Sequence, residues 1–313
     1  MITISPIGTG EPSGRIPPTS SENPMKRFFV PAAVVLAGAA FAGAGHAACP
    51  TDEQVKAVAD AYIAGKQLAP PEGLSAEDTL CGRDKLLRML GGHYGRVVGY
   101  KAGLTNPAAQ KLFNYPQPVR GVLFERMLKH DGEDVSLSAP GIMFEADLIV
   151  EVKDAAINEA KTPLEALRSI RAVYPFIELP RGVFNAPPAK LGGLNLLYHN
   201  VAAFSGVLGK PVTVEATQQG LDSLANMTVM LMDGTGATLD SAKGAALMEN
   251  PINAVLWLAA DLKKSGGALK AGDLLSLGTL SRIHPAKPGG SARVRYEGLP
   301  GNPEVSVRFV DNQ

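Results

Sequence analysis

Short apolar runs, separated by glycine and proline turns, fill the chain after Arg96 and restrict its fold more than any other feature. They lie at 97–100, 121–124, 144–152, 227–232, 273–277 and 305–310. Runs of this length between turn residues are typical of strands. Two helices are expected among them, at 163–173 and 251–264, each with a proline near its first turn. Because strands outnumber helices without regular alternation, we expect an α+β fold with a folded sheet, not a doubly wound one.

The segment before Arg96 has a different pattern, because its apolar residues recur at helical spacing. Val55, Val58 and Tyr62 mark one helix, and a proline-rich break then precedes a second helix that starts near Ser75. We therefore expect a small helical N-terminal region over 48–95 and a larger, strand-rich domain over 96–313.

Residues 1–47 are expected to be an upstream extension followed by a signal peptide that starts at Met25. Lys26 and Arg27 precede an apolar stretch without charge until Asp52, and small residues surround Ala47. This order is typical of a cleavable export signal. Glycine, alanine and proline within the stretch make a poor spanning helix. We predict a periplasmic or secreted protein that begins near residue 48, with no stable membrane anchor after processing.

The charge balance excludes two classes of partner. Thirty basic residues face thirty acidic ones, so the formal net charge is zero. No overall field attracts the chain to nucleic acid or to an anionic membrane.

Two cysteines, Cys49 and Cys81, are present. An even count in an exported chain predicts one disulfide between them, with two free thiols as the alternative. Neither arrangement makes them catalytic.

Two carboxylates lie on one face of an expected strand. Glu145 and Asp147 are two residues apart within 144–152, and strand side chains alternate between faces. Burying such a pair is costly unless a cation neutralises it, and oxygen ligands favour ions such as Mg²⁺, Mn²⁺ or Ca²⁺. The same spacing also fits an ordinary strand with its acidic residues facing solvent.

Two further charges stand in apolar surroundings. Glu178 lies in the stretch that closes the first expected interior helix, and Lys101 lies among glycines at the end of a strand. A charge in such a place requires a partner, and a buried lysine requires an anion. Each segment alone also fits an ordinary strand or turn.

Together, several motifs carry a resemblance to a known family. They are Val98-Gly-Tyr-Lys-Ala-Gly-Leu-Thr105, Gly121-Val-Leu-Phe124, Glu145-Ala-Asp147, Glu178, Asn250-Pro-Ile-Asn253 with Trp257, and Ala271-Gly-Asp273. In order and spacing they resemble the 2-oxopent-4-enoate hydratase (2-keto-4-pentenoate hydratase) family of the fumarylacetoacetate hydrolase superfamily. The resemblance covers roughly residues 52–309.

The resemblance implies a small helical region on a mixed β-sandwich or roll core, in a homo-oligomer. It implies Mg²⁺ or Mn²⁺ held by Glu145, Asp147 and Glu178, and it makes Lys101 the active-site lysine. A small 2-oxo acid would chelate the ion through its carboxylate and keto oxygens, while the lysine offsets the incoming charge. The remaining substrate contacts are placed at Leu104, Gly278 and Thr279.

The chain departs from the family pattern in the residues that handle protons. Val119-Arg120 stands where the family has an acid, His199-Asn200-Val201-Ala202 stands where it has Asp-Asn-Ala-Ser, and Leu277 replaces a threonine. Arg120 is a candidate for binding a second substrate carboxylate, or else a solvated loop residue. His199 is a candidate acid or base, or else a structural histidine.

These features predict a metal-dependent lyase that acts on a small 2-oxo acid or its enol. Such an enzyme would be a hydratase, which converts a 2-hydroxydienoate to a 4-hydroxy-2-oxo acid, or a decarboxylase. The alternatives are an acylpyruvate hydrolase of the fumarylacetoacetate type and a non-catalytic periplasmic protein that binds 2-oxo acids.

Overall fold

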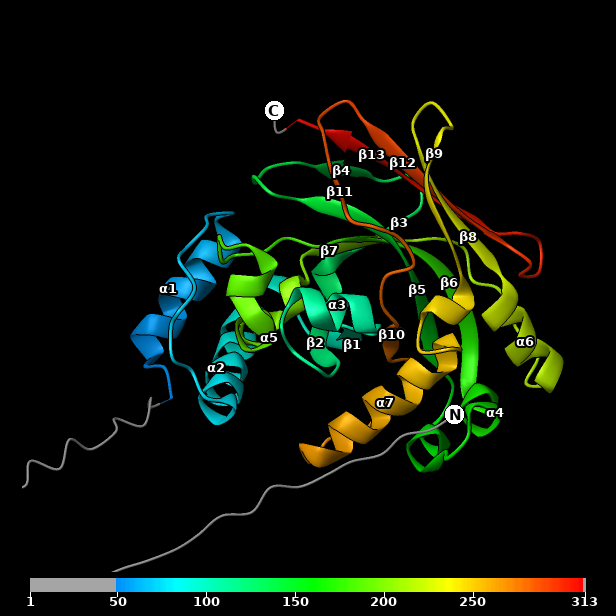
Figure 1. The fold of residues 1–313 in the computed structure, drawn as a ribbon, viewed down its shortest axis with the longest axis horizontal. Coiled ribbons are helices and arrows are strands. Elements are labelled where there is room, and N and C mark those ends of the chain that lie inside the picture. The colour runs from blue at the N-terminus through cyan, green and yellow to red at the C-terminus, as the bar shows by residue number, and fades with distance from the viewer. Residues whose placement is uncertain (1–48, 312–313) are drawn as a thin grey trace, which may run out of the picture. The chain divides into compact units, whose positions relative to one another are not determined.

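The computed structural model of the protein describes residues 49–311 (Figure 1). The expected signal peptide and its cleavage site lie outside these residues. Within 49–311, no helix is long and apolar enough to cross a membrane.

Two capped helices form the N-terminal region. Helix α1 spans Asp52–Ile63 and helix α2 spans Ala76–Tyr94. Thr51 and Ser75 each accept a hydrogen bond from the backbone three residues on and complete a capping box, which satisfies N–H groups that a helix start leaves unpaired. The expected helical region and its second start at Ser75 are confirmed.

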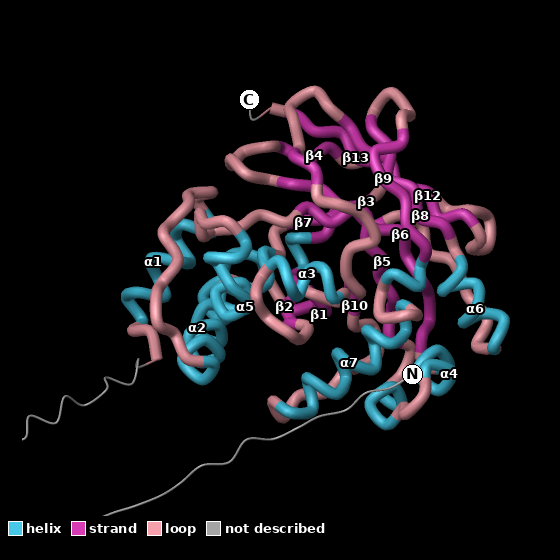
Figure 2. Tube along the Cα trace, in the orientation of Figure 1, coloured by secondary structure: helices cyan, strands magenta, loops and turns pink. Residues whose placement is uncertain are grey.

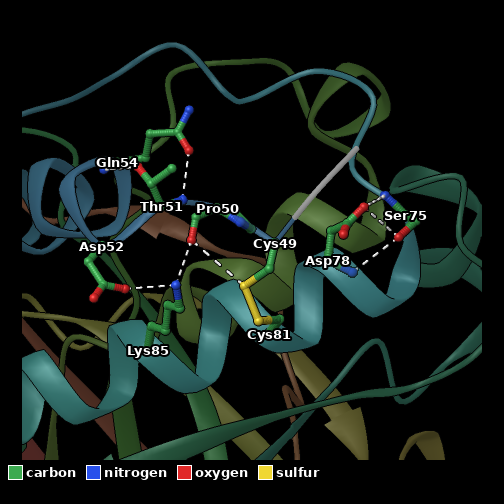
Figure 3. Close-up of a disulfide and its surroundings, with 9 residues drawn as sticks. All are labelled: Cys49, Pro50, Thr51, Asp52, Gln54, Ser75, Asp78, Cys81 and Lys85. Atoms are coloured by element: carbon green, nitrogen blue, oxygen red, sulfur yellow. Dashed lines mark hydrogen bonds and ion pairs between the residues drawn. A yellow bond between two sulfur atoms is a disulfide. The ribbon is translucent and has the colours of Figure 1, made fainter. Parts of the chain in front are cut away.

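A disulfide and an ion pair hold the start of this region against α2. Cys49 is bonded to Cys81, with a sequence separation of 32 (Figure 3). The Lys85 ammonium lies 2.7 Å from a carboxylate oxygen of Asp52 and donates to the Pro50 carbonyl at 3.0 Å. The predicted pairing of the two cysteines is confirmed in the structure.

The larger sheet has the order β2-β1-β10-β5-β6-β7-β3, with β11 paired to β5. Its strands are β1 Val97–Gly103, β2 Val119–Phe124, β3 Leu128–His130, β5 Met143–Val152, β6 Ile170–Leu179, β7 Ser205–Leu208, β10 Leu274–Ser276 and β11 His284–Pro285. The two edge strands, β2 and β3, are joined only by the short 3-10 helix Glu125–Met127. Six flat strand spacings would span about 29 Å, whereas four residue steps reach only about 14 Å. The sheet must therefore curl to bring its edges together.

The smaller sheet has the order β4-β13-β12-β8-β9 and packs on one face of the larger sheet. Its strands are β4 Asp134–Ser136, β8 Thr228–Asp233, β9 Thr238–Lys243, β12 Ser291–Glu297 and β13 Glu304–Val310. Leu148 and Ile177 of the larger sheet share a core with Val229 and Val294 of the smaller one. Figure 2 shows the strands of both sheets with helices at their margins. The expected α+β class and mixed roll core are confirmed.

The helices after Arg96 were only partly expected. Helix α7 spans Pro251–Lys264 as predicted. The helix predicted at 163–173 is wrong beyond Arg168, because α4 covers Pro163–Arg168 and residues from Ile170 onward form β6. Pairing with β5 overrides the local pattern there. Three further helices were not expected: α3 Pro107–Leu112, α5 Pro188–Tyr198 and α6 Gln218–Asn226.

Removing the disulfide should lower stability. In the chain-entropy model a loop of this length is worth roughly 3–4 kcal/mol, so the double variant Cys49→Ser/Cys81→Ser should lose about that much free energy of unfolding in urea denaturation. Reduced parent protein should match the variant. Equal stability of the variant and the oxidised parent would contradict this account.

Candidate functional site

Five polar side chains share one face of the larger sheet. Across β5 and β6, Glu145 is paired directly with Glu178, and Asp147 lies two residues along the same strand. Across β1 and β10, Lys101 is paired with Ser276. Residues opposite each other in neighbouring strands project to the same face. All five lie on the face opposite to Leu148 and Ile177, whose side chains pack against the smaller sheet.

Lys101 and Glu178 form a buried ion pair. The side chains of both residues are only 5% exposed, and the Lys101 Nζ donates to a carboxylate oxygen of Glu178. The same Nζ donates to the Val201 carbonyl at 3.1 Å. A buried charge pair is tolerated only when further hydrogen bonds satisfy it. The predicted need of Lys101 for an anionic partner is thus met by Glu178.

Asp147 is held by donors from the turn that follows β10. Its carboxylate accepts from the Ser276 hydroxyl at 2.5 Å and from the Gly278 backbone N–H at 3.0 Å. In contrast, one carboxylate oxygen of Glu145 is buried and has no protein hydrogen-bond partner. An orphaned buried acceptor is costly, so this oxygen requires a proton or a cation.

The cluster holds three carboxylates and one ammonium, so negative charge is in excess. Burial, reinforced by repulsion from Glu178, raises the pKa of Asp147 to about 7 and raises the pKa of Glu145 well above its usual value. Burial alone would lower the pKa of Lys101, but attraction to the Glu178 and Glu145 carboxylates outweighs it and raises that pKa. The cluster therefore favours added positive charge.

The three carboxylates suit a hard divalent cation in donor type and strand position. As the side chains stand, no three His, Cys, Asp or Glu residues within 49–311 converge on a metal geometry. Two of the carboxylates have other partners: Glu178 is paired with Lys101, and Asp147 accepts hydrogen bonds from Ser276 and Gly278. Glu145 and Glu178 are directly opposed, and such residues have Cβ atoms about 5 Å apart, a spacing at which two carboxylates can share one ion. The residues thus fit a metal.

His199 is fully buried at the end of α5. Its Nδ1 lies 2.6 Å from the Asn195 carbonyl, which fixes Nδ1 as the donor, while Nε2 has no protein partner. Burial, reinforced by the positive charges of Lys101 and Arg181, lowers the pKa of His199 to about 4. The imidazole is therefore neutral at pH 7. Its catalytic role stays a prediction.

Arg120 is placed differently from the other predicted site residues. It is paired with Ala102, the neighbour of Lys101 on β1, and so projects to the opposite face. There it donates to Asp261 at 2.7 Å and lies over the Tyr100 ring. Its charge is thus already paired with Asp261, and the contact of Arg120 with a substrate carboxylate stays a prediction.

The remaining predicted residues surround the cluster. Gly278 donates to Asp147, and the Thr279 hydroxyl, next to the cluster, donates to the Ser281 carbonyl at 2.8 Å. Leu104 follows β1 with a left-handed φ of 55°. The next residue, Thr105, lines an open groove of about 510 Å³ that also includes Trp257.

Three residues near the cluster were missed by sequence reasoning. Ser276 binds Asp147, Asn200 binds the backbone of β2, and Arg181 is 1% exposed with its Nε and Nη1 unpartnered. Ser276 and Arg181 are polar residues in apolar stretches, the same signal that identified Glu178. Asn200 was named only as part of a run.

Two relatives found by sequence comparison are named hydratases. A 2-keto-4-pentenoate hydratase of Burkholderia vietnamiensis is 30% identical over 208 residues, which cover 65% of this chain and 76% of that protein. A 2-hydroxyhexa-2,4-dienoate hydratase of Comamonas testosteroni is 28% identical over 260 residues, covering 80% of this chain and 94% of that protein.

A solved structure shares the fold. It is the 4-oxalocrotonate decarboxylase from Pseudomonas putida G7, complexed with magnesium and adipate, and it matches with a TM-score of 0.71 at 23% identity. The match covers 84% of this chain and 100% of that one. No family model matches the sequence. On the evidence of its relatives, the chain belongs to the 2-keto-4-pentenoate hydratase family.

Proposed function

We propose that the protein is a divalent-metal-dependent lyase acting on a small 2-oxo acid or its enol, with hydration of a 2-hydroxydienoate as the first candidate reaction. The observation that carries the proposal is the buried set of Glu145, Asp147 and Glu178 beside Lys101, in a chain whose relatives are named hydratases. Mg²⁺ or Mn²⁺ is the proposed cofactor.

A bound metal would polarise the substrate keto group and supply the positive charge that balances the three carboxylates. The chain's own residues bind and orient. Lys101 has three N–H donors, of which Glu178 and Val201 take two, so one remains for the substrate carboxylate. The neutral imidazole of His199 keeps Nε2 as a free hydrogen-bond acceptor and has no proton to donate there at pH 7, so it does not suit an acid.

Decarboxylation is the second candidate. The structure of the 4-oxalocrotonate decarboxylase is matched over its whole length. In addition, Arg120 stands where the family hydratases have an acid, among the residues that handle protons, and this departure weakens the case for hydration. Arg120 is instead paired with Asp261. A hydrolase has weaker support, because the fumarylpyruvate hydrolase of Pseudomonas aeruginosa matches with a TM-score of only 0.50. The formation of a homo-oligomer stays a prediction.

Export to the periplasm is the proposed location. The basic and apolar pattern from Met25 supports it, as does a disulfide that requires an oxidising compartment. Mass spectrometry of the protein purified from the periplasm should find a mature N-terminus near Ala48. A full-length protein recovered from the cytoplasm would contradict export.

Metal binding should depend on all three carboxylates. Glu145→Gln, Asp147→Asn and Glu178→Gln each remove one anionic oxygen ligand, and each should weaken Mg²⁺ or Mn²⁺ binding more than about 100-fold, beyond the effect of residues that only support a ligand. Isothermal titration calorimetry measures this. Glu151→Gln is the matched control, because Glu151 lies on the same strand but binds Tyr174 and Arg171.

The same variants should lose metal-dependent consumption of 2-hydroxypenta-2,4-dienoate, followed by its ultraviolet absorbance, while Glu151→Gln keeps it. Metal binding without turnover of any 2-oxo acid or enol would favour the non-catalytic binding protein. Normal metal affinity in the three variants would reject the site.

His199 should make the protein sensitive to acid. Folding lowers the pKa of His199, so as pH falls the unfolded chain takes up a proton before the folded chain does. The contribution of His199 to the free energy of unfolding is therefore complete above about pH 6.5 and is lost as pH falls toward 4. At pH 5 this amounts to about 2 kcal/mol. His199→Asn, which can still donate to Asn195, should lose less stability between pH 7 and pH 5 than the parent, as measured by urea denaturation. The same loss in both proteins would contradict a neutral buried histidine.

A further inference from the structure

Three successive residues other than glycine adopt a left-handed backbone beside Lys101. The φ angles are 61° at Asn200, 55° at Val201 and 54° at Ala202. Such values are unfavourable for residues with a Cβ, and a β-branched residue such as Val201 is a true outlier. A strained segment persists only when its surroundings hold it, and such segments concentrate at functional sites.

The Asn200 side chain holds this turn with two hydrogen bonds. Its Oδ1 accepts from the Val122 backbone N–H at 2.7 Å, and its Nδ2 donates to the Val122 carbonyl at 2.9 Å. Asn200 is fully buried. At the other end of the turn, the Ala202 carbonyl accepts from the Arg181 backbone N–H at 2.9 Å. The turn is therefore fixed both to β2 and to the end of β6.

Two glycines provide the space for this turn. A Cβ at Gly121 would lie 2.8 Å from the Asn200 carbonyl oxygen and 2.9 Å from Cγ of Lys101. A Cβ at Gly103 would lie 2.5 Å from Cγ1 of Val201. Glycine at these two strand positions lets the turn pack directly onto Lys101.

We propose that Asn200 is a positioning residue for Lys101, acting through the strained turn and the Val201 carbonyl. This inference rests on the proposed function, in which Lys101 binds the substrate carboxylate. The carbonyl accepts from the Lys101 Nζ at 3.1 Å and is the second protein partner of that ammonium.

The second partner matters because Glu178 is also a proposed metal ligand. If Glu178 held a cation, its hold on Lys101 would weaken, and the Val201 carbonyl would remain as the partner that keeps the ammonium in place. A carbonyl is neutral, so it orients the lysine without offsetting the charge that the substrate carboxylate requires.

The test compares Asn200→Ala with a matched control. Asn158 holds the backbone of Leu269 in the same way, accepting from its N–H at 2.9 Å and donating to its carbonyl at 2.8 Å. Asn158→Ala therefore removes the same kind of contact at a different place. Calorimetry with Mg²⁺ and then oxalate separates metal binding from binding of a substrate mimic.

Asn200→Ala should bind Mg²⁺ nearly as the parent does but bind oxalate about tenfold more weakly, the scale expected when a supporting residue is lost. In a Lys101→Ala background, Asn200→Ala should cause no further loss, because both changes remove one function. Asn158→Ala should leave oxalate binding unchanged. Unchanged oxalate affinity in Asn200→Ala, or an additive loss in the double variant, would overturn the proposal.

A second measurement requires neither metal nor substrate. In the metal-free protein, labelling of Lys101 by an amine-reactive reagent, followed by peptide mass spectrometry, should be faster in Asn200→Ala than in the parent and in Asn158→Ala. If Lys101→Ala binds oxalate normally, the proposed substrate role fails, and the labelling still decides whether Asn200 positions Lys101. If Asn200→Ala does not fold, Gly103→Ala places a Cβ against Cγ1 of Val201 and not against Lys101, so it displaces the turn and should give the same results. Parent-like binding and labelling in that variant would overturn the proposal.

Discussion

The burial of three carboxylates with a single ammonium on one sheet face is the constraint on which the rest of the site depends. Glu145, Asp147 and Glu178 carry more negative charge than Lys101 offsets, and all four residues are at most 5% exposed. Desolvation of unbalanced charge costs several kcal/mol per ion. The metal-free chain limits this cost by raising the pKa values of Glu145 and Asp147 and by turning side chains onto Lys101 and Ser276. A divalent cation removes the imbalance directly.

The fold supplies what this cluster requires. The antiparallel register of β5 and β6 places Glu145 opposite Glu178, and β10 brings Ser276 beside Lys101. On the other face, Leu148 and Ile177 belong to the core shared with the smaller sheet, which keeps the strands rigid behind the polar groups. The turn at Asn200 then restrains Lys101 from the side of α5. Rigid elements and backbone contacts thus hold the polar groups in place, as a binding site requires.

The sequence was informative where a signal is local. The alternation in β5 correctly placed Glu145 and Asp147 on one face, and the start of α7 at Pro251 follows from a proline in the first turn. Glu178 was placed in the stretch that closes a helix and not in a strand, because its pairing with β5 is not encoded in its neighbours. Likewise, Asn200 binds Val122 across 78 residues of sequence, and no local pattern reveals such a contact. The resemblance to a family, carried by motif order, supplied the ligand set that periodicity alone left open.

The altered surroundings of the site set the remaining question, because the carboxylates and lysine fit the family while His199 and Arg120 depart from it. The most direct measurement is anomalous diffraction from a crystal soaked with Mn²⁺ and oxalate. The account predicts one manganese peak within bonding distance of Glu145, Asp147 and Glu178, with the Lys101 ammonium beside an oxalate carboxylate. Manganese bound elsewhere, or a Lys101 ion pair with Glu178 that excludes the metal, would contradict it.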